Sequence, residues 1–284
     1  MKSGLILEGG AMRGMFSCGV IDVLLERGVA FDGAAGISAG AVFGCNYKSR
    51  QPGRAIRYNK RYSRDPRYCS LRSLIATGDL YGADFCYRLL PDELDPFDRA
   101  AFAANPMEFW IGATDVDTGR PVYHLCTDGG ALDMLWLRAS ASMPVVSRPV
   151  AAEGLRLLDG GVSDAVPFAW MEARGYDRNL IVLTQPKGYR KQKCPPLVPA
   201  LLRRWPRLAG AVARRHEMYN RQMDDIDLRE GGAGPARTLV VRPPEPLGIG
   251  RTERDPAQLD RVYRMGRGEA LRRIGEIEAF LEIR

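Results

Sequence analysis

Residues 31–47 read FDGAAGISAGAVFGCNY, and positions 36–40 within them surround one serine with residues that have almost no side chain. The first part of this stretch leads as a strand into Ser38, and the second part has a helical pattern. A strand that reverses sharply into a helix is a nucleophile elbow, which strains the serine backbone and crowds the residues two positions away on either side. We therefore interpret Ser38 as a candidate nucleophile and Gly36 and Gly40 as its supporting residues. The alternative is ordinary close packing of a strand against a helix.

Outward from this turn, short apolar strands alternate with helices along the chain. This alternation predicts an α/β fold with a largely parallel sheet covered by helices on both faces. We expect residues 1–186 to form the catalytic core. Residues 187–284 hold a basic helical segment, a further strand and C-terminal helices, which we expect to pack on or extend the same domain. The predicted strands are 4–8, 31–37, 155–158, 179–184 and 238–242 with a hairpin at 109–125, and the predicted helices follow residues 14 and 38 and span 132–141, 166–174 and 258 onward.

The composition is that of a globular enzyme. The chain has 284 residues, of which 45% are hydrophobic, with charges interspersed throughout. Its first apolar run is too short for a signal peptide, and no stretch of eighteen residues lacks charge, so we expect a cytoplasmic protein without a membrane-spanning helix. The six cysteines are scattered singly, which favours free thiols in a reducing compartment over disulfides or a zinc site.

Positive charge is concentrated in two places, although the net charge is only +7. The first basic segment, residues 48–72, has nine Lys or Arg against one acid, Asp65. The second basic segment, residues 187–221, has ten against one acid, Glu217. Such segments attract phosphate-rich partners, either lipid head groups or nucleic acid, or they form solvated helix faces.

A glycine loop, GGAMRG at residues 9–14, follows the first predicted strand. Successive glycines leave backbone N–H groups unshielded, so that several can point at one oxyanion. The spacing matches neither a phosphate P-loop nor a dinucleotide fingerprint. A plain strand-to-helix turn is the alternative. The candidate oxyanion residues are Gly9, Gly10, Ala11, Arg13 and Gly14.

A serine nucleophile needs a base, and the chain has two histidines. In the usual triad the histidine follows the acid, but His124 lies in an apolar strand before Asp159, and His216 lies in a basic helix that we expect to be exposed. A carboxylate can accept the proton directly if it is held against the hydroxyl in a partly desolvated pocket. Asp159 ends a predicted strand, as Ser38 does, so both should lie at the same edge of the sheet. Gly160 and Gly161 would let the chain turn there, although Asp-Gly-Gly also occurs in ordinary turns.

These three motifs, in this order, resemble those of the patatin-like phospholipases. The segments RYNKRY, SLIATGDLYGADF, ATDVDTGRPVY, ASASMPVVSRPV, LLDGGVSDAVP and VLTQPKGYRK extend the similarity, over residues 4–250, to a bacterial branch with an extra C-terminal region. The resemblance implies an α/β/α sandwich with a Ser38–Asp159 dyad and a Gly9, Gly10, Arg13, Gly14 oxyanion loop. The family's third loop glycine is Ala11 here, which matters only if that residue needs a positive φ.

The resemblance also implies a function, the acyl hydrolysis of a lipid ester through an acyl-enzyme, with no metal and no cofactor. Asp115 and Asp117 beside a Thr-Gly turn suit turn chemistry better than a metal site. Ser140 and Ser142 resemble a family segment near the site, and by spacing alone they could cap or pack.

The second basic segment also holds an amphipathic set, Leu201, Leu202, Trp205, Leu208 and Val212. We expect this set either to lie on an anionic membrane surface or to cover the acyl cleft. Rival interpretations are a lipid-binding or regulatory protein, a nucleic-acid binder built on RYNKRYSRDPRY, and a histidine-triad esterase. We expect no nucleic-acid partner, and the sequence gives no prediction of oligomeric state.

Overall fold

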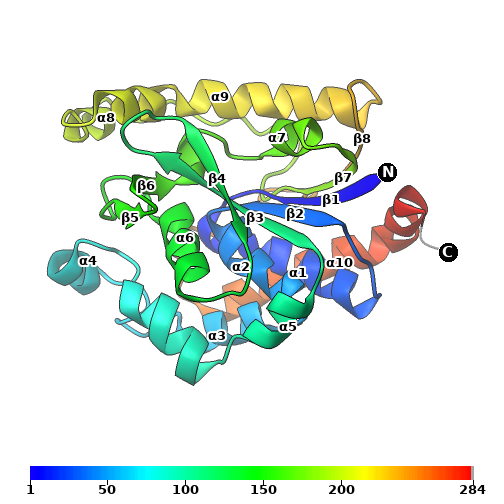
Figure 1. Cartoon of the computed structure of the whole chain (residues 1–284), viewed down its shortest axis with the longest axis horizontal. Helices are drawn as coiled ribbons and strands as arrows, with labels where there is room; N and C mark the ends of the chain where they lie inside the picture. The colour runs from blue at the N-terminus through cyan, green and yellow to red at the C-terminus, as the bar shows by residue number, and fades with distance from the viewer. Residues whose placement is uncertain (283–284) are drawn as a thin grey trace.

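A mixed eight-stranded sheet forms the centre of the computed structural model, which describes residues 1–282 (Figure 1). Its order is β5-β6-β3-β2-β1-β7-β8, with β4 paired to β3. Strands β1, β2, β3, β7 and β8 run parallel, and β4, β5 and β6 are antiparallel additions at one side. The strands are β1 (Lys2–Leu7), β2 (Gly33–Ile37), β3 (Glu108–Asp115), β4 (Pro121–Cys126), β5 (Val150–Ala152), β6 (Leu155–Asp159), β7 (Tyr176–Val182) and β8 (Arg237–Val241).

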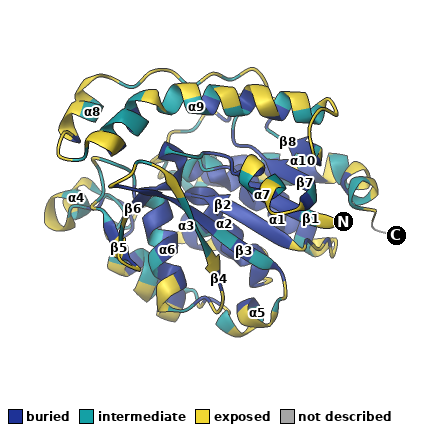
Figure 2. Ribbon diagram, turned by 45° about the horizontal axis from the view of Figure 1, so that its top comes forward, coloured by how far each residue is buried: buried dark blue, intermediate teal, exposed yellow. Residues whose placement is uncertain are grey.

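Helices cover both faces of this sheet, so the predicted three-layer α/β/α architecture is confirmed (Figures 1 and 2). Side chains of α7 and α9 pack on one face, and those of α1, α2, α6 and α10 pack on the other. The helices are η1 (Ala11–Gly14), α1 (Met15–Glu26), α2 (Ala39–Lys48), α3 (Arg54–Tyr62), α4 (Leu71–Thr77), η2 (Phe85–Leu94), α5 (Arg99–Ala104), α6 (Ala131–Ala141), η3 (Gly160–Val162), α7 (Phe168–Ala173), α8 (Leu197–Leu201), α9 (Pro206–Glu230) and α10 (Pro256–Leu281).

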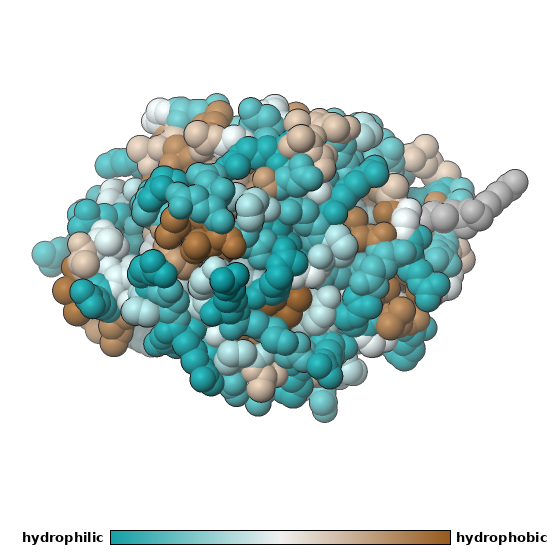
Figure 3. Space-filling model, turned by 90° about the horizontal axis from the view of Figure 1, so that it is seen from below, coloured by the Kyte–Doolittle hydropathy of each residue, from teal (hydrophilic) through white to brown (hydrophobic). Residues whose placement is uncertain are grey.

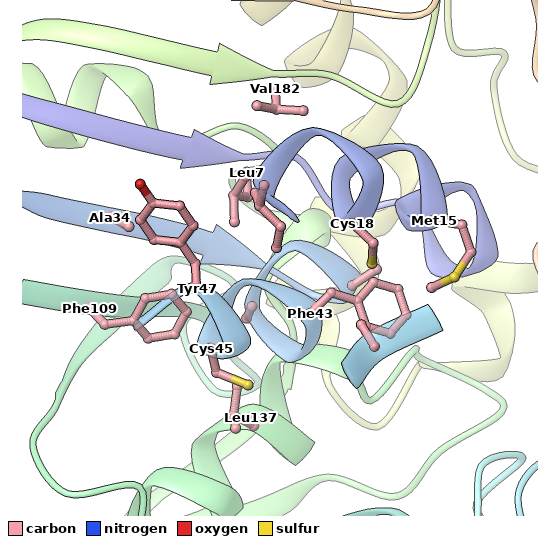
Figure 4. Close-up of a cluster of buried hydrophobic side chains, with 14 of the residues drawn as sticks. Leu7, Met15, Cys18, Ala34, Phe43, Cys45, Tyr47, Phe109, Leu137 and Val182 are labelled. Atoms are coloured by element: carbon pink, nitrogen blue, oxygen red, sulfur yellow. The ribbon is translucent and has the colours of Figure 1, made fainter. Parts of the chain in front are cut away.

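The larger core lies between the sheet and the layer of α1 and α2 (Figure 4). Leu7 of β1 and Phe109 of β3 meet Phe43 and Cys45 of α2 there, all of them buried. Burial raises the pKa of Cys45 to about 12, so this side chain stays a neutral thiol. Such packing around the strand ends fixes the helix that follows Ser38.

The first and last long helices, α1 and α10, cross at two glycines. A side chain at Gly19 would lie 2.1 Å from the carbonyl oxygen of Tyr263, and one at Gly266 would lie 2.0 Å from that of Phe16. Only glycine allows the two backbones to approach this closely. The crossing fixes α10 against the first helix of the catalytic core.

The C-terminal region is continuous with the sheet and its covering layers. Strand β8 pairs in parallel with β7, and α9 buries a stripe of side chains at helical spacing over the sheet. Leu202, Leu208 and Val212 pack against Val116 and Leu158, so three of the five residues predicted to face a membrane or the cleft are core residues. Full burial of one such leucine contributes about 2 kcal/mol. Within the described part of the chain, no helix has the length and apolar character needed to cross a bilayer.

Candidate active site

Ser38 occupies the sharp turn between β2 and α2. Its backbone has φ 54° and ψ −121°, a conformation that non-glycine residues rarely adopt. A Cβ at Gly36 would lie 2.5 Å from the carbonyl oxygen of Gly40, and one at Gly40 would lie 2.3 Å from that of Leu7. The small residues on either side of the serine are therefore required by the turn itself, as the sequence pattern predicts.

Strand β3 brings Asp159 to Ser38. Along one edge of β3, β2 pairs as far as Gly112, where its partner is Ile37, and β6 pairs from Ala113, where its partner is Asp159. The parallel β2 and the antiparallel β6 thus end opposite each other on neighbouring residues of one strand. The Ser38 hydroxyl donates a 2.8 Å hydrogen bond to Asp159 Oδ2.

The other atoms of Asp159 are also held by hydrogen bonds. Its Oδ1 accepts from the Gly161 N–H at 2.7 Å, and its carbonyl oxygen accepts from the Thr114 hydroxyl at 2.8 Å. A side chain at Gly160 would lie 2.4 Å from the carbonyl oxygen of Gly112. The carboxylate is buried, with 3% of the residue exposed, and one of its oxygens is directed at Ser38.

Two further serines brace the dyad. Ser140 Oγ accepts from the Ser38 N–H at 2.8 Å and donates to the carbonyl oxygen of Gly112 at 2.6 Å. The carbonyl oxygen of Ser142 accepts from the Asp159 N–H at 2.7 Å. The sequence indicated only that this pair lies near the site or caps a helix, and the structure gives both a positioning contact.

The glycine loop lies directly against the serine. A Cβ at Gly9 would lie 3.0 Å from Ser38 Cβ, and one at Gly10 would lie 2.7 Å from the hydroxyl of Thr184. Within the described residues, no backbone carbonyl accepts from the N–H of Gly9 or Gly10. Gly9 and Gly10 line the same cavity as Ser38.

Ala11 departs from expectation, because its φ is +49°. Alanine can replace glycine at this position without cost only if the residue has a negative φ. The structure requires a positive φ here, so the replacement has a cost. The left-handed conformation costs an alanine about 1 kcal/mol relative to glycine. Gly14 closes the loop, since a side chain there would lie 2.9 Å from the ring of Phe43.

Neither histidine touches the dyad. His124 Nε2 lies 2.8 Å from Asp133 Oδ1, and its ring stacks on Trp136. His216 on α9 lies 3.9 Å from a carboxylate oxygen of Glu217. Neither ring lines the cavities that meet at Ser38.

The residues with metal-binding potential have other roles in this structure. Asp115 accepts from the Thr118 hydroxyl and so fixes the hairpin turn, and Asp117 pairs with Arg156. Among the described residues, one His/Cys/Asp group has its candidate ligand atoms within 4.8 Å of one another, namely His124, Cys126 and Asp133. Oδ2 of that aspartate already accepts three backbone N–H bonds from the adjacent loop, so the group braces the loop.

An apolar cavity opens from Ser38 on the side of α2 and η2. Four of its lining residues are tyrosines, and two of these, Tyr58 and Tyr68, come from RYNKRYSRDPRY. Both are buried and so are not free to stack on bases, as a nucleic-acid binder would require. No sequence pattern indicates this cavity, which is lined by Ala11, Met12, Ser38, Ala39, Val42, Phe43, Tyr58, Tyr68, Tyr81, Cys86, Tyr87, Leu90, Ala141 and Met143.

Arg13, like Gly9 and Gly10, lies on the polar side of Ser38. Its guanidinium Nε is buried and has no hydrogen-bond partner among the described residues. With Ser38 and Asp159 it lines a second, polar cavity on the α9 side of the serine. The dyad therefore lies where an apolar and a polar cavity meet.

Comparison with known protein families divides the chain into two matched parts. A family model described as patatin-like phospholipase matches residues 5–169. A second model, described as a domain of unknown function (DUF6363), matches residues 205–282. Between them, the two models cover both the dyad and the C-terminal helices.

The individual proteins that resemble this chain have low sequence identity to it. The uncharacterized protein YjjU of Escherichia coli strain K12 is 29% identical over 283 residues, which cover 94% of this chain and 75% of YjjU. Lysophospholipase nte1 of Aspergillus niger is 25% identical over 285 residues, covering 93% of this chain but 17% of the much longer fungal protein. Among solved structures, VipD from Legionella pneumophila aligns with a TM-score of 0.46 at 13% identity, covering 95% of this chain and 66% of that one.

Proposed function

The chain belongs to the patatin-like phospholipase family and is thereby a lipid acyl hydrolase, and from that premise we propose that it cleaves carboxylic esters of phospholipids or lysophospholipids with a Ser38–Asp159 dyad. The observation that carries the proposal is the 2.8 Å hydrogen bond from the Ser38 hydroxyl to Asp159 at a strained strand-to-helix turn. A binding protein has no need of a strained serine hydrogen-bonded to a buried carboxylate.

The reaction proceeds in two acyl transfers. Asp159 accepts the Ser38 proton as Oγ bonds to the ester carbonyl carbon, and the N–H groups of the glycine loop stabilise the oxyanion. The carbon–oxygen bond to the alcohol then breaks, and Asp159 returns the proton to the leaving alcohol. Water next attacks the acyl-enzyme, giving its proton to Asp159, and the fatty acid leaves as Ser38 recovers a proton.

The apolar cavity supports a long-chain acyl group as the substrate's fatty part. It begins at Ser38 and is walled mainly by aromatic and aliphatic side chains from α2, α3 and η2. An acyl chain placed there would leave its carbonyl at the serine. We assign the catalytic parts to the core of residues 1–186, with residues 187–284 completing the walls around them.

The test is labelling with a fluorophosphonate, followed by hydrolysis of lysophospholipid and monoacylglycerol. We expect one adduct, on Ser38, that is absent in Ser38→Ala and slowed by roughly a thousandfold in Asp159→Asn. Asp117→Asn removes an exposed carboxylate outside the site and serves as the matched control. Loss of labelling in both His124→Ala and Asp159→Asn would instead indicate a histidine triad, and a folded protein without an adduct would indicate a lipid-binding role.

We also propose that the enzyme meets its substrate at an anionic bilayer. Helix α4 exposes Leu71 and Ile75, with 72% and 87% of each residue accessible, and α8 exposes Leu197 and Leu201. Helix α4 lies between two tyrosines that line the apolar cavity, Tyr68 and Tyr81.

Both helices lie at the same end of the molecule's long axis (Figures 1 and 2), and Figure 3 shows hydrophobic surface beside hydrophilic surface at that end. Arg64 precedes α4, Arg72 lies in its first turn, and Arg203 and Arg204 follow α8, all of them exposed. Exposed apolar side chains next to cations are the combination that binds anionic lipid surfaces.

A further inference from the structure

The polar cavity on the α9 side of Ser38 is rich in cations. Arg13 follows β1, Lys191 lies between β7 and α8, Arg215 is on α9, and Arg251 lies between β8 and α10. Two carboxylates, those of Glu8 and Asp159, line the same space. Three of the four cations come from residues beyond 186, outside the part of the chain that the patatin-like model matches.

These four cations have no ion-pair partner among residues 1–282. The two carboxylates are already engaged by neutral groups. Glu8 accepts from the Tyr219 hydroxyl at 2.8 Å and from the Thr184 N–H at 2.6 Å, and Asp159 accepts from Ser38. The cavity therefore carries an excess of positive charge.

The arrangement is costly without a ligand. Arg215 donates from Nε to the carbonyl oxygen of Gly161 at 2.5 Å, and the Nε of Arg13 is buried without a partner. Burial, followed by the nearby charge of Arg215, lowers the pKa of Lys191 to about 7. Arg13, Lys191 and Arg215 are partly buried and Arg251 is exposed. Like charges that are partly buried repel one another and lose hydration, and a bound anion with several oxygens would relieve both effects.

The position of this cavity relative to Ser38 indicates which anion it would take. The apolar cavity and the polar cavity share Ala11, Ser38 and Met143, so they open on two sides of the nucleophile. An ester whose acyl chain lies in the apolar cavity would direct its alcohol part toward the cations. In a glycerophospholipid, that alcohol part carries a phosphate a few bonds from the ester oxygen.

We propose that Lys191, Arg215 and Arg251, with Arg13, bind the phosphate of a glycerophospholipid or lysophospholipid head group while Ser38 attacks its ester. The assignment rests on the proposed function, because it uses the ester's position at Ser38. Guanidinium groups bind phosphate oxygens in pairs, and the lysine adds a point charge. The C-terminal region would thus select phosphate-bearing esters over neutral ones.

Hydrolysis of two esters that differ only in the phosphoglycerol head group tests this proposal. Palmitoyl lysophosphatidylglycerol and monopalmitoylglycerol share acyl chain and glycerol. We expect Lys191→Gln and Arg251→Gln each to lower kcat/KM for the lysophospholipid by roughly tenfold to a hundredfold and to change that for the neutral ester by less than about twofold. The matched controls Lys193→Gln and Arg27→Gln remove exposed cations outside the cavity. Equal losses on both esters would overturn the proposal.

A binding measurement separates this proposal from the proposed function. Ser38→Ala protein is titrated with glycerol phosphate and with inorganic phosphate. The titrations are then repeated with the double variant that carries both Ser38→Ala and Lys191→Gln. Glycerol phosphate binding that weakens tenfold or more in the double variant supports the cavity assignment even if the wild type hydrolyses neither ester. Unchanged binding overturns it. Inorganic phosphate could bind as tightly as glycerol phosphate while Lys191→Gln and Arg251→Gln both keep the preference for the lysophospholipid over the neutral ester. In that case the cavity binds free phosphate and the head-group assignment fails.

Discussion

The two basic segments of this chain have similar compositions and different structural roles. In the first basic segment, residues 48–72, the cations nearest the core hold the fold together. Lys48 Nζ donates to the carbonyl oxygens of Asn105 and Met107, and the buried Arg54 donates to Asn46 Oδ1 and the carbonyl oxygen of Asp95. Lys48 and Arg54 therefore have their hydrogen-bond acceptors within the protein and do not need an external anion.

In the second basic segment, residues 187–221, the two cations nearest the site make few such contacts. Lys191 lies 4.2 Å above the ring of Tyr219, and Arg215 Nε donates to the carbonyl oxygen of Gly161. The difference follows from position. The first segment continues the elbow helix into the core, whereas the second crosses the carboxyl ends of the parallel strands, where ligands bind in open α/β sheets. A run of positive charge in a sequence therefore has no fixed meaning until the topology places it.

The largest effect should come from removing a structural cation of the first segment. Arg54→Met leaves Asn46 Oδ1 and the carbonyl oxygen of Asp95 without their buried donor. We expect the free energy of unfolding to fall by about 3 kcal/mol, more than a hundredfold in the folding equilibrium, measured by urea denaturation. Arg72→Met, which removes an exposed cation of the same segment, should change it by less than about 0.5 kcal/mol. If the two variants were equally stable, the contrast between the segments would not hold.

The next effect concerns catalysis. Arg215→Gln removes a charge from the cationic cavity and a donor from the turn that holds Asp159. We expect kcat/KM for lysophospholipid to fall roughly fiftyfold, with a smaller fall for the neutral ester. Arg215→Lys should recover much of the preference for the phosphate-bearing ester, because it restores the charge. A loss of stability as large as that of Arg54→Met, without a change in ester preference, would make Arg215 structural as well.

The pH dependence sharpens the comparison within the second segment. The pKa of Lys191 is about 7, so the protonated, phosphate-binding form prevails below that pH and is lost above it. We expect KM for lysophospholipid to rise above pH 7 by up to about tenfold per pH unit, while KM for the neutral ester stays flat.

Other charges face the same cavity, namely those of Arg13, Arg215, Arg251 and Glu8, and Tyr219 lies under the lysine. The ratio of the two KM values, measured from pH 6 to about 9, cancels any pH dependence that the two esters have in common. In Lys191→Gln this ratio should no longer vary with pH. If the KM ratio varied with pH as much in Lys191→Gln as in the wild type, a group other than Lys191 would cause the pH dependence.

The smallest effect is expected at the exposed end of the second segment. Arg203→Gln should weaken binding to vesicles containing phosphatidylglycerol by about fivefold at low salt and by less at high salt. Hydrolysis of a dispersed short-chain ester should not change. Sedimentation with sucrose-loaded vesicles measures the partitioning, and equal losses in both assays would contradict a role in surface docking.

Local signals made the centre of the site predictable from sequence. The crowding of Gly36 against Gly40 and Ala41 at the Ser38 turn depends on neighbours within a few residues, which the sequence displays directly. Asp159 was also predictable, because the carboxyl ends of strands gather at one edge of a sheet. The observed strand arrangement is more specific than this expectation. Strand β6 is antiparallel to β3, and it ends opposite β2 on neighbouring residues of β3.

Long-range packing hid the rest of the site. The tyrosines of the apolar cavity come from a segment that reads as a solvated basic helix, and the π-helical turns of η2 that help to enclose it have no sequence signature. Leu208 and Val212 have the amphipathic spacing of a membrane helix, but a helix that covers a sheet has the same spacing. The three short antiparallel strands, β4 to β6, were only partly foreseen, because β5 has three residues.

The crossing of α1 and α10 at Gly19 and Gly266 has a consequence for how the protein is made. Helix α10 covers one side of α1, and the segment that leads into it carries Arg251, whose carbonyl oxygen accepts from the Met12 N–H of the glycine loop. A nascent chain therefore keeps an apolar face of its first helix uncovered until the last helix has left the ribosome. The Met12 N–H of the glycine loop likewise gains its backbone acceptor only when the segment that leads into α10 has emerged.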